Sequence, residues 1–265
     1  MKHITYFATI LLISFVLITS CKGQDVEENQ EDKIEQKKIK QLKAINLKDK
    51  KELAKFIDTL ILDRFYMEID KFKKDDSLQP YKTTDIVFVG SSSIRKWKDL
   101  KKDMKNLNVL NRGFGGSTVP EAIFYSDILI LKHKPKKIVF YSGDNDIADL
   151  KSSTDQIIES YKYFFRLINK ELPNTSLFIL SIKPSPARWR YWKKAFKINT
   201  QLTNICAQNS NYTFIDVSSS MIDSTGNLNA GLFLKDRIHL NKKGYKLWAD
   251  IIFPVISENT KTENK

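Results

Sequence analysis

The sequence predicts an α/β fold in which a parallel sheet is covered by helices on both faces. Five short apolar runs of six or seven residues follow Pro80, and longer stretches with apolar residues three and four positions apart separate them. Continuous apolar strands that alternate with helices are typical of a parallel sheet buried on both sides. The composition agrees, because 42% hydrophobic and 28% charged residues are typical of a globular protein.

The five runs are the predicted strands, and the stretches between them are the predicted helices. The strands are DIVFVG (Asp85–Gly90), NVLNRG (Asn108–Gly113), KIVFYSG (Lys137–Gly143), SLFILSI (Ser176–Ile182) and YTFIDV (Tyr212–Val217). Residues 118–134 and 153–172 show helical spacing, and a last helix is predicted from about Lys242 to Val255. An apolar stripe from Leu53 to Phe65 predicts an amphipathic helix before the first strand.

The N-terminal residues are typical of a secretory signal. Lys2 is followed by an apolar run that is too short to span a membrane comfortably, and small residues precede Cys21. The ending ITSC resembles a bacterial lipobox, in which the cysteine is lipidated; an uncleaved signal anchor is the alternative. We therefore expect an extracytoplasmic protein anchored to a bacterial membrane through Cys21. The expected divisions are a lipoprotein signal peptide (1–20), a charged tether (21–50), the main domain (51–256) and a polar tail (257–265).

The charge of the chain is unevenly placed. The formal net charge is +13. The excess of positive charge lies between Tyr81 and Lys265, a segment that contains 29 basic and 17 acidic residues. Such a domain should favour anionic surfaces or ligands. No nucleic-acid-binding motif is visible, so acidic lipids or polysaccharides are the expected partners rather than nucleic acid. Two cysteines and three histidines predict neither a disulfide framework nor a histidine-rich zinc site.

Unusual local sequences follow each predicted strand. They are SSS, FGGST, DND, KPSPARWRYW and, after a loop, KDRIHLN. Because ligands of parallel sheets bind beyond the carboxyl ends of the strands, we expect these sequences to meet at one edge. His3 lies in the signal segment and His133 precedes the third strand, so His239 is the histidine expected there.

The residue types at this edge suit nucleophilic chemistry. Serine needs a base to accept its proton, and His239 can serve as that base with Asp236 three residues before it to orient the ring. Paired glycines at 115 and 116 permit backbone N–H groups to approach an oxyanion, and Asn145 can offer its side-chain amide. Each feature alone also occurs in ordinary turns.

Taken together, these residues resemble the SGNH or GDSL-like hydrolase family. The matching positions are Ser92 in VGSSSI, Gly116 in NRGFGGST, Asn145 in SGDND and His239 in DRIHLN, over about residues 51–255. The resemblance implies a flavodoxin-like three-layer α/β/α sandwich, and ester hydrolysis with no metal or cofactor. It assigns Ser92, Asp236 and His239 to a catalytic triad, and Ser92, Gly116 and Asn145 to the oxyanion hole. Ser91 stands where the family usually has aspartate, so three adjacent serines compete for the role of nucleophile.

Three residues are predicted to contact substrate. Arg188 and Trp189 lie in a segment with six basic residues and no acidic one, at the start of the loop after the fourth strand. They could form a wall for a sugar face or an anionic group, or belong to a solvated helix start. Arg112 could line the pocket or pair with a structural carboxylate. The expected substrate is a short acyl ester of a glycan or lipid. The alternatives are an acyltransferase, a lysophospholipase or thioesterase, and a non-catalytic binding lipoprotein.

Overall fold

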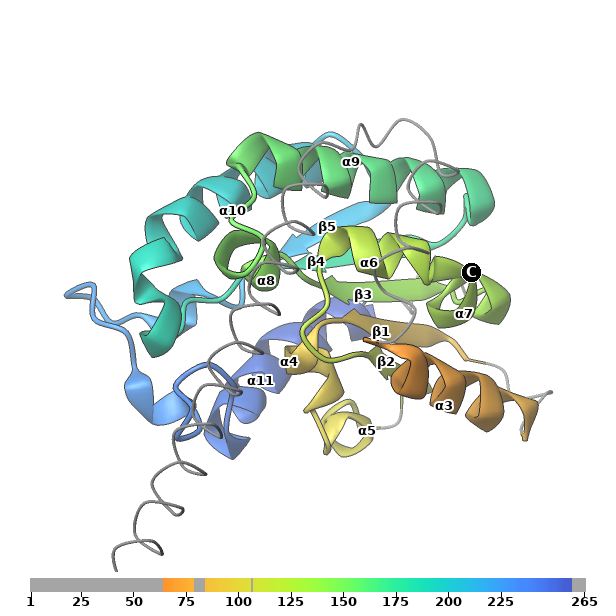
Figure 1. The fold of residues 1–265 in the computed structure, drawn as a ribbon, viewed down its shortest axis with the longest axis horizontal. Helices are drawn as coiled ribbons and strands as arrows, with labels where there is room; N and C mark the ends of the chain where they lie inside the picture. The colour runs from red at the N-terminus through yellow and green to blue at the C-terminus, as the bar shows by residue number, and fades with distance from the viewer. Residues whose placement is uncertain (1–63, 79–83, 106, 259–265) are drawn as a thin grey trace, which may run out of the picture. The chain divides into compact units, whose positions relative to one another are not determined.

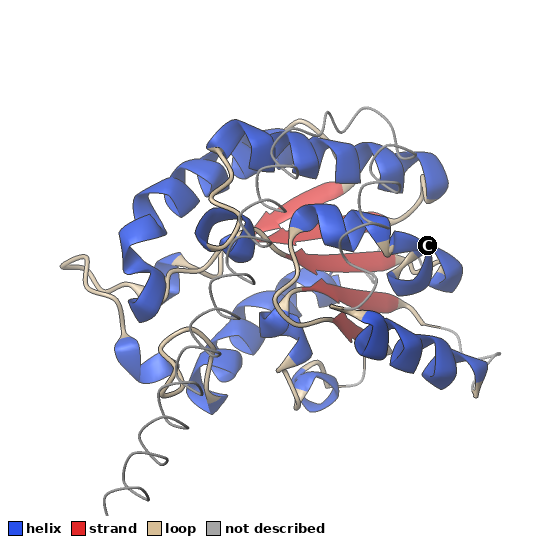
Figure 2. Cartoon of the chain, in the orientation of Figure 1, coloured by secondary structure: helices blue, strands red, loops and turns tan. Residues whose placement is uncertain are grey.

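The structure is a five-stranded sheet with helices packed on both faces. The computed structural model describes residues 64–78, 84–105 and 107–258. All strands are parallel, in the order β2-β1-β3-β4-β5 (Figures 1 and 2). They are β1 (Ile86–Gly90), β2 (Val109–Gly113), β3 (Lys137–Tyr141), β4 (Ser176–Leu180) and β5 (Tyr212–Ile215). This order is that of a flavodoxin-like fold, so the predicted three-layer α/β/α architecture with five parallel strands is confirmed.

Helices form a layer on each side of the sheet. In Figure 1 the helices α9 and α10 lie above the sheet, α6 lies in front of its strands, and α5 and α11 lie below it. The helices of the described residues are α3 (Tyr66–Ser77), α4 (Ser92–Arg95), α5 (Leu100–Asp103), α6 (Val119–Phe124), α7 (Ser126–Leu129), α8 (Asp144–Ala148), α9 (Thr154–Glu171), α10 (Trp192–Ala207) and α11 (Lys242–Glu258). Short 3-10 turns add η1 (Leu131–His133), η2 (Pro186–Tyr191), η3 (Ser219–Met221) and η4 (Ala230–Leu232).

The core consists of two apolar layers, one on each face of the sheet. Successive residues of a strand contribute to opposite layers. Phe140 of β3 faces α9, where its ring stacks on Phe164 with centroids 4.3 Å apart. The next residue, Tyr141, faces the opposite layer and packs 5.1 Å from Trp248 of α11. Because successive side chains of a strand point to opposite faces, both sides of each strand are buried. This explains why the strands read as continuous apolar runs.

The carboxyl ends of the strands are level with one another. In the register of the sheet, Gly90 at the end of β1 pairs with Gly113 of β2 and with Tyr141 of β3. The chain leaves β3 at Ser142 and turns at Gly143, whose φ of +108° suits glycine. The third, fourth and fifth strands therefore end two residues earlier than predicted. The segments that follow them begin at one edge of the sheet.

Two helical regions differ from the sequence prediction. Residues 118–134 form three short elements, α6, α7 and η1, rather than one helical stretch. The break lies at Tyr125, whose ψ of 10° departs from helical geometry and whose ring packs edge-on against Phe114. The predicted helix from Leu53 to Phe65 lies outside the described residues up to residue 63. The helix described in this region is α3, which was not predicted because Ile69 is its only buried residue.

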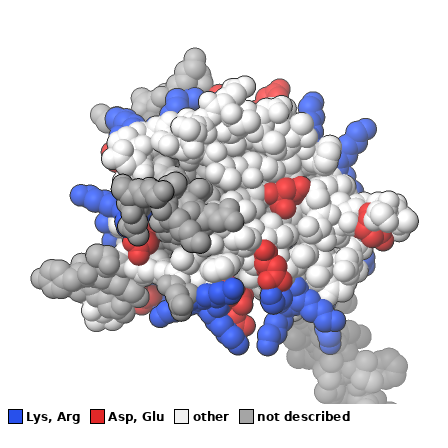
Figure 3. All heavy atoms as spheres, turned by 180° about the vertical axis from the view of Figure 1, so that it is seen from behind, with Lys and Arg blue, Asp and Glu red and all other residues white. Residues whose placement is uncertain are grey.

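On the face seen in Figure 3, most Lys and Arg side chains lie around the outline and much of the middle is uncharged. Among the described helices, none combines the length and apolar character that a membrane span requires. The predicted signal peptide, Cys21, the tether and the polar tail beyond residue 258 lie outside the described residues.

Candidate functional site

A tight turn after β1 presents Ser92 at the edge of the sheet. Gly90 has a φ of +146°, and a Cβ there would lie 1.8 Å from the carbonyl oxygen of Tyr141. Only glycine fits this close approach between neighbouring strands. Ser91 is extended and α4 begins at Ser92, so the Ser92 N–H lies in the first turn and has no intrahelical acceptor. The turn therefore places the hydroxyl and the backbone N–H of Ser92 at the same edge.

The side chains of Ser92, His239 and Asp236 form one hydrogen-bonded chain. Nε2 of His239 lies 2.9 Å from Oγ of Ser92, although 147 positions separate them in the sequence. Nδ1 of the same ring lies 2.7 Å from Oδ2 of Asp236. The other carboxylate oxygen accepts the backbone N–H groups of Ile238 and His239 at 3.0 and 2.9 Å. The three predicted triad residues therefore lie together with the spacing that proton transfer requires.

The carboxylate of Asp236 is fixed by a strained turn. Arg237 adopts a φ of +60°, which bends the chain so that Asp236 faces the N–H groups and ring of the residues that follow. Burial opposes ionisation, but the hydrogen bonds from His239 and Ile238 outweigh it and hold the pKa of the Asp236 carboxyl below its usual range. Asp236 is thus a carboxylate at neutral pH, and the N–H of Nδ1 is directed at it.

The three adjacent serines differ in what they contact. Ser91 and Ser93 are buried, with 0% and 1% exposure, and no hydrogen bond among the described residues joins either to His239. Ser92 alone of the three directs its hydroxyl at the imidazole. The tyrosine hydroxyl of Tyr245 further holds α4 by donating to the carbonyl of Ser93 at 2.9 Å. The contacts of the hydroxyl groups therefore distinguish Ser92 from Ser91 and Ser93, which the sequence alone could not do.

The glycine turn leaves one backbone donor available. The N–H of Gly115 donates to Glu68 of α3 at 3.2 Å, and Glu68 is paired with Arg95 at 3.0 Å. Gly116 has a φ of +70°, and its carbonyl accepts from Arg64 at 2.9 Å. The Gly116 N–H has no acceptor among the described residues. Of the two glycines, Gly116 is therefore the one whose N–H is available to a ligand, and its place in an oxyanion hole stays a prediction.

Asn145 is held in a defined orientation by two partners. Its Nδ2 donates to the carbonyl of Ser117 at 2.9 Å, and its Oδ1 accepts from Arg188 at 2.9 Å. Because arginine only donates, the oxygen and nitrogen of the amide are distinguished. One N–H of the amide remains for a ligand. Arg188 also bonds Asp149 at 3.1 Å and lies 3.5 Å from Asp144.

Buried ionisable groups connect the loops that carry these residues. Asp146 accepts the N–H of Val119 at 3.1 Å, which ties the turn after β3 to the start of α6. Burial raises the pKa of Asp146 to about 8. Lys183, after β4, donates to the carbonyl of Ile238 at 3.0 Å and lies 3.7 Å from Asp144. The loop of His239 and the loop of Asn145 are therefore held through one buried ammonium group.

Sequence reasoning missed several residues of the site. Lys96 lies at the end of α4, with Nζ 3.2 Å from Nδ1 of His239 and 4.0 Å from Asp236. Its position four residues after Ser92 on a helical turn is the one signal that could have found it. Glu68 lies in a charged segment in which nothing local marks it as part of a site, whereas Asp146 lies in the DND sequence expected at this edge but was given no role.

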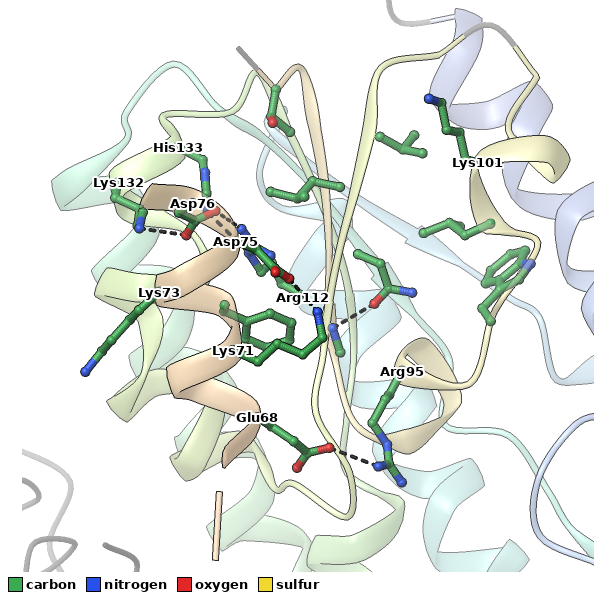
Figure 4. Close-up of a pocket in the computed structure, with 18 of the residues that line it drawn as sticks. Glu68, Lys71, Lys73, Asp75, Asp76, Arg95, Lys101, Arg112, Lys132 and His133 are labelled. Carbon is green, nitrogen blue, oxygen red and sulfur yellow. Dashed lines mark hydrogen bonds and ion pairs between the residues drawn. The ribbon is translucent and has the colours of Figure 1, made fainter. Parts of the chain in front are cut away.

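The structure places Arg112 away from the triad contacts. Its side chain is 4% exposed and forms an ion pair with Asp76 of α3, over the ring of Phe72 at 4.7 Å (Figure 4). His133 accepts from its Nε at 3.4 Å. Burial and the charge of Arg112 lower the pKa of His133 to about 4. Both features considered for Arg112 are observed, because it forms the ion pair and also lines the pocket drawn in Figure 4. The lining of that pocket does not include Ser92, Asp236 or His239, so contact of Arg112 with substrate stays a prediction.

Arg188 and Trp189 lie side by side but differ in environment. The guanidinium of Arg188 is engaged with Asn145, Asp144 and Asp149, so the structure shows it positioning an amide of the site. Trp189 is 40% exposed and stacks on Trp192. Contact of either residue with substrate stays a prediction. Within the described parts of the chain, no three His, Cys, Asp or Glu side chains are grouped so that they could hold a metal ion.

Comparisons with known proteins agree with this architecture. Residues 84–247 match the GDSL-like Lipase/Acylhydrolase family. A GDSL-like lipase from Bacteroides thetaiotaomicron is similar in structure, with a TM-score of 0.60 and 18% identity over 72% of this chain and 98% of that one. A lipase/acylhydrolase from Enterococcus faecalis has a TM-score of 0.55 and 20% identity over 67% and 97% of the two chains.

A third solved structure is similar over much the same part of the chain. A carbohydrate esterase family 3 protein from Talaromyces cellulolyticus has a TM-score of 0.55 and 16% identity over 68% of this chain and 99% of that one. Among curated proteins, no match to this sequence was found. These structural similarities support the fold, and the family match spans more than half of the chain. The chain therefore belongs to the GDSL-like lipase/acylhydrolase family.

Proposed function

We propose that this protein is a serine esterase that hydrolyses carboxylic esters through Ser92, His239 and Asp236. The observation that carries the proposal is the pair of contacts made by one imidazole. Its Nε2 lies 2.9 Å from the Ser92 hydroxyl and its Nδ1 lies 2.7 Å from a carboxylate. This arrangement activates serine in acyl transfer. Membership in an acylhydrolase family supports the same reaction class.

The proposed reaction begins with proton transfer within this chain of contacts. His239 accepts the proton of Ser92 as Oγ attacks the ester carbonyl. The negative charge that develops on the carbonyl oxygen is stabilised by the N–H groups of Ser92 and Gly116 and by the free N–H of Asn145. His239 then gives its proton to the alcohol as it leaves. Water attacks the acyl-enzyme by the reverse path and releases the acid.

Asp236 has an electrostatic and a positional role in this proposal. Its low pKa keeps it charged across the neutral and mildly acidic range, so it stabilises the imidazolium that forms when His239 takes the proton. The hydrogen bond to Nδ1 also keeps the tautomer in which Nε2 is free to act as base. Lys183 supports the same loop through the Ile238 carbonyl.

We propose short acyl groups, such as acetyl, on glycans or lipids as the substrates. A panel of nitrophenyl esters from acetate to palmitate tests this, with the highest kcat/KM expected for acetate or butyrate. An optimum at palmitate would contradict the short-acyl proposal and favour a lipase. Release of acetate from an acetylated glycan in water without added acceptor distinguishes hydrolysis from the alternative, acyl transfer to a sugar hydroxyl.

Arg188→Met is expected to lower kcat by roughly tenfold to a hundredfold with little change in KM. The reason is that the Asn145 amide loses the partner that orients its donor, and removing an oxyanion donor outright costs about a hundredfold or more. Steady-state kinetics on a neutral and an anionic ester measure the effect. Arg190→Met is the matched control, because that exposed guanidinium lies over Tyr191 and not on Asn145.

The two esters separate the two roles of Arg188. An equal loss of kcat on both esters is the result expected for a positioning residue. A loss confined to the anionic ester would instead assign Arg188 to substrate binding, as predicted from the sequence. Unchanged kcat on both esters would contradict both roles.

The membrane anchor is a separate proposal that rests on the sequence. We propose that the N-terminal segment directs export and that Cys21 is lipidated, which would tether the domain to a bacterial membrane. In cells, incorporation of a clickable palmitate analogue should be seen with the natural chain and lost in Cys21→Ser. Equal labelling of the two chains would contradict lipidation at this position.

A further inference from the structure

A row of aromatic side chains is exposed beside the candidate site. Trp189, Trp192 and Phe196 lie three and four residues apart along η2 and α10. The indoles of Trp189 and Trp192 are nearly parallel, with centroids 6.3 Å apart, and Phe196 packs edge-on to Trp192 at 5.9 Å. Trp189 is 40% exposed and Phe196 is 58% exposed. Large apolar side chains gathered on a surface mark a contact with something other than water.

Cations surround this aromatic row, and no carboxylate neutralises them. Arg190, Lys193 and Lys197 are exposed on the same segment, and within the described parts of the chain none of them forms an ion pair. The sequence from residue 172 to residue 215 contains no Asp or Glu. We call these six residues the aromatic–basic face: Trp189, Arg190, Trp192, Lys193, Phe196 and Lys197. Its charge is complementary to an anionic partner.

The face is rigidly joined to both loops of the candidate site. Ala187 donates its N–H to the carbonyl of Arg237 at 3.0 Å, next to the loop that carries His239. Arg188 bonds Asn145 and Asp149. Trp189 follows directly, so whatever binds the aromatic–basic face also lies at the edge where the ester would react.

We propose that the aromatic–basic face docks on the surface of an anionic lipid bilayer and holds the candidate site at its headgroups. Indole and phenyl rings beside Lys and Arg are the combination that partitions into the interfacial region of a membrane. Each cation adds attraction to anionic lipids. Phe196 favours a lipid over a glycan as partner, because this most exposed ring of the three has no polar atom to bond a sugar hydroxyl.

The four tryptophans of the chain allow a test that is specific to this face. Trp97 and Trp248 are buried, with 1% and 0% exposure, whereas Trp189 lies in the face and is exposed. Quenching of tryptophan emission by brominated lipid therefore reports contact at Trp189 and its stacked neighbour. This holds even if the N-terminal segment of the full chain also inserts into the vesicle.

The experiment adds full-length protein to vesicles that contain brominated phosphatidylglycerol, or to brominated phosphatidylcholine vesicles. Strong quenching is expected with the anionic vesicles and little with the neutral ones. The variant Lys193→Glu/Lys197→Glu should need at least about tenfold more lipid for the same quenching, because two charges change sign and the net charge of the face falls by four units. Lys101→Glu/Lys102→Glu is the matched control, since these exposed lysines lie on α5 below the sheet (Figure 1); it should quench like the unaltered protein.

Other outcomes would overturn the proposal. Absence of quenching with anionic vesicles, or equal quenching with neutral ones, contradicts docking by charge and aromatic rings. A change in emission with polygalacturonate but not with vesicles would assign the face to an acidic glycan instead. Because the readout needs no turnover, it stands apart from the esterase proposal. Hydrolysis of nitrophenyl acetate by the Lys193→Glu/Lys197→Glu variant should be unchanged, which shows that the variant is folded.

Discussion

Ser92→Ala is expected to lower ester hydrolysis by roughly three orders of magnitude or more, with the fold intact. Alanine removes the only one of the three serine hydroxyls that contacts His239, at 2.9 Å. No other described side chain is placed to attack in its stead. The cost to folding should be small, about 1 kcal/mol, because one partly solvated hydrogen bond is lost. Nitrophenyl acetate turnover and a thermal melt measure the two effects.

The neighbouring serines provide the control for this substitution. Ser91 and Ser93 are buried, and neither bonds the imidazole. Ser91→Ala and Ser93→Ala should therefore retain turnover within about an order of magnitude. If Ser92→Ala keeps near-normal activity while Ser91→Ala or Ser93→Ala loses it, the nucleophile has been assigned to the wrong residue.

His239→Ala is expected to have an effect similar to that of Ser92→Ala. Without the ring, no base accepts the Ser92 proton and no acid protonates the leaving alcohol. Because the two residues act as a unit, the double variant Ser92→Ala/His239→Ala should be no slower than the slower single variant. Initial rates on a short ester, measured with enough enzyme to detect slow turnover, test both statements.

The second described histidine is a matched control. His133 lies beside Arg112 and Asp76, and its pKa of about 4 keeps it neutral at the assay pH. His133→Gln should keep nearly full turnover of the folded protein at 25 °C. Full loss in His133→Gln together with persistent activity in His239→Ala would reverse the assignment of the base.

The meeting of Ser92 with His239 was predictable because parallel strands place all their carboxyl ends at one edge. Any serine after the first strand and any histidine after the last then share that edge. Of the three histidines, His3 lies in the signal segment and His133 precedes the third strand, which left His239 as the histidine expected at this edge. The strands were predictable for a related reason, since a strand buried on both faces must be apolar throughout, as in β1 and β3.

The support of the site was not predictable from sequence patterns. Contact of Arg188 with substrate stays a prediction, but its hydrogen bond to Asn145, 43 residues away, was not predicted. Arg112 pairs with Asp76 of α3, and Glu68 of the same helix holds Gly115. Such pairs depend on where two loops or helices pass each other in space. Such pairs produce no periodic pattern of residues in the sequence. The helix α3 itself buries too little apolar surface to give a recognisable helical spacing of apolar residues.

The most direct test of the central claim is the site of covalent labelling by a fluorophosphonate. Such a probe reacts with a serine only where a base activates the hydroxyl, as proposed for His239 and Ser92. After digestion, mass spectrometry should locate the label on Ser92, and labelling should disappear in His239→Ala. A label on another residue, or active esterase that takes no label at all, would contradict the account.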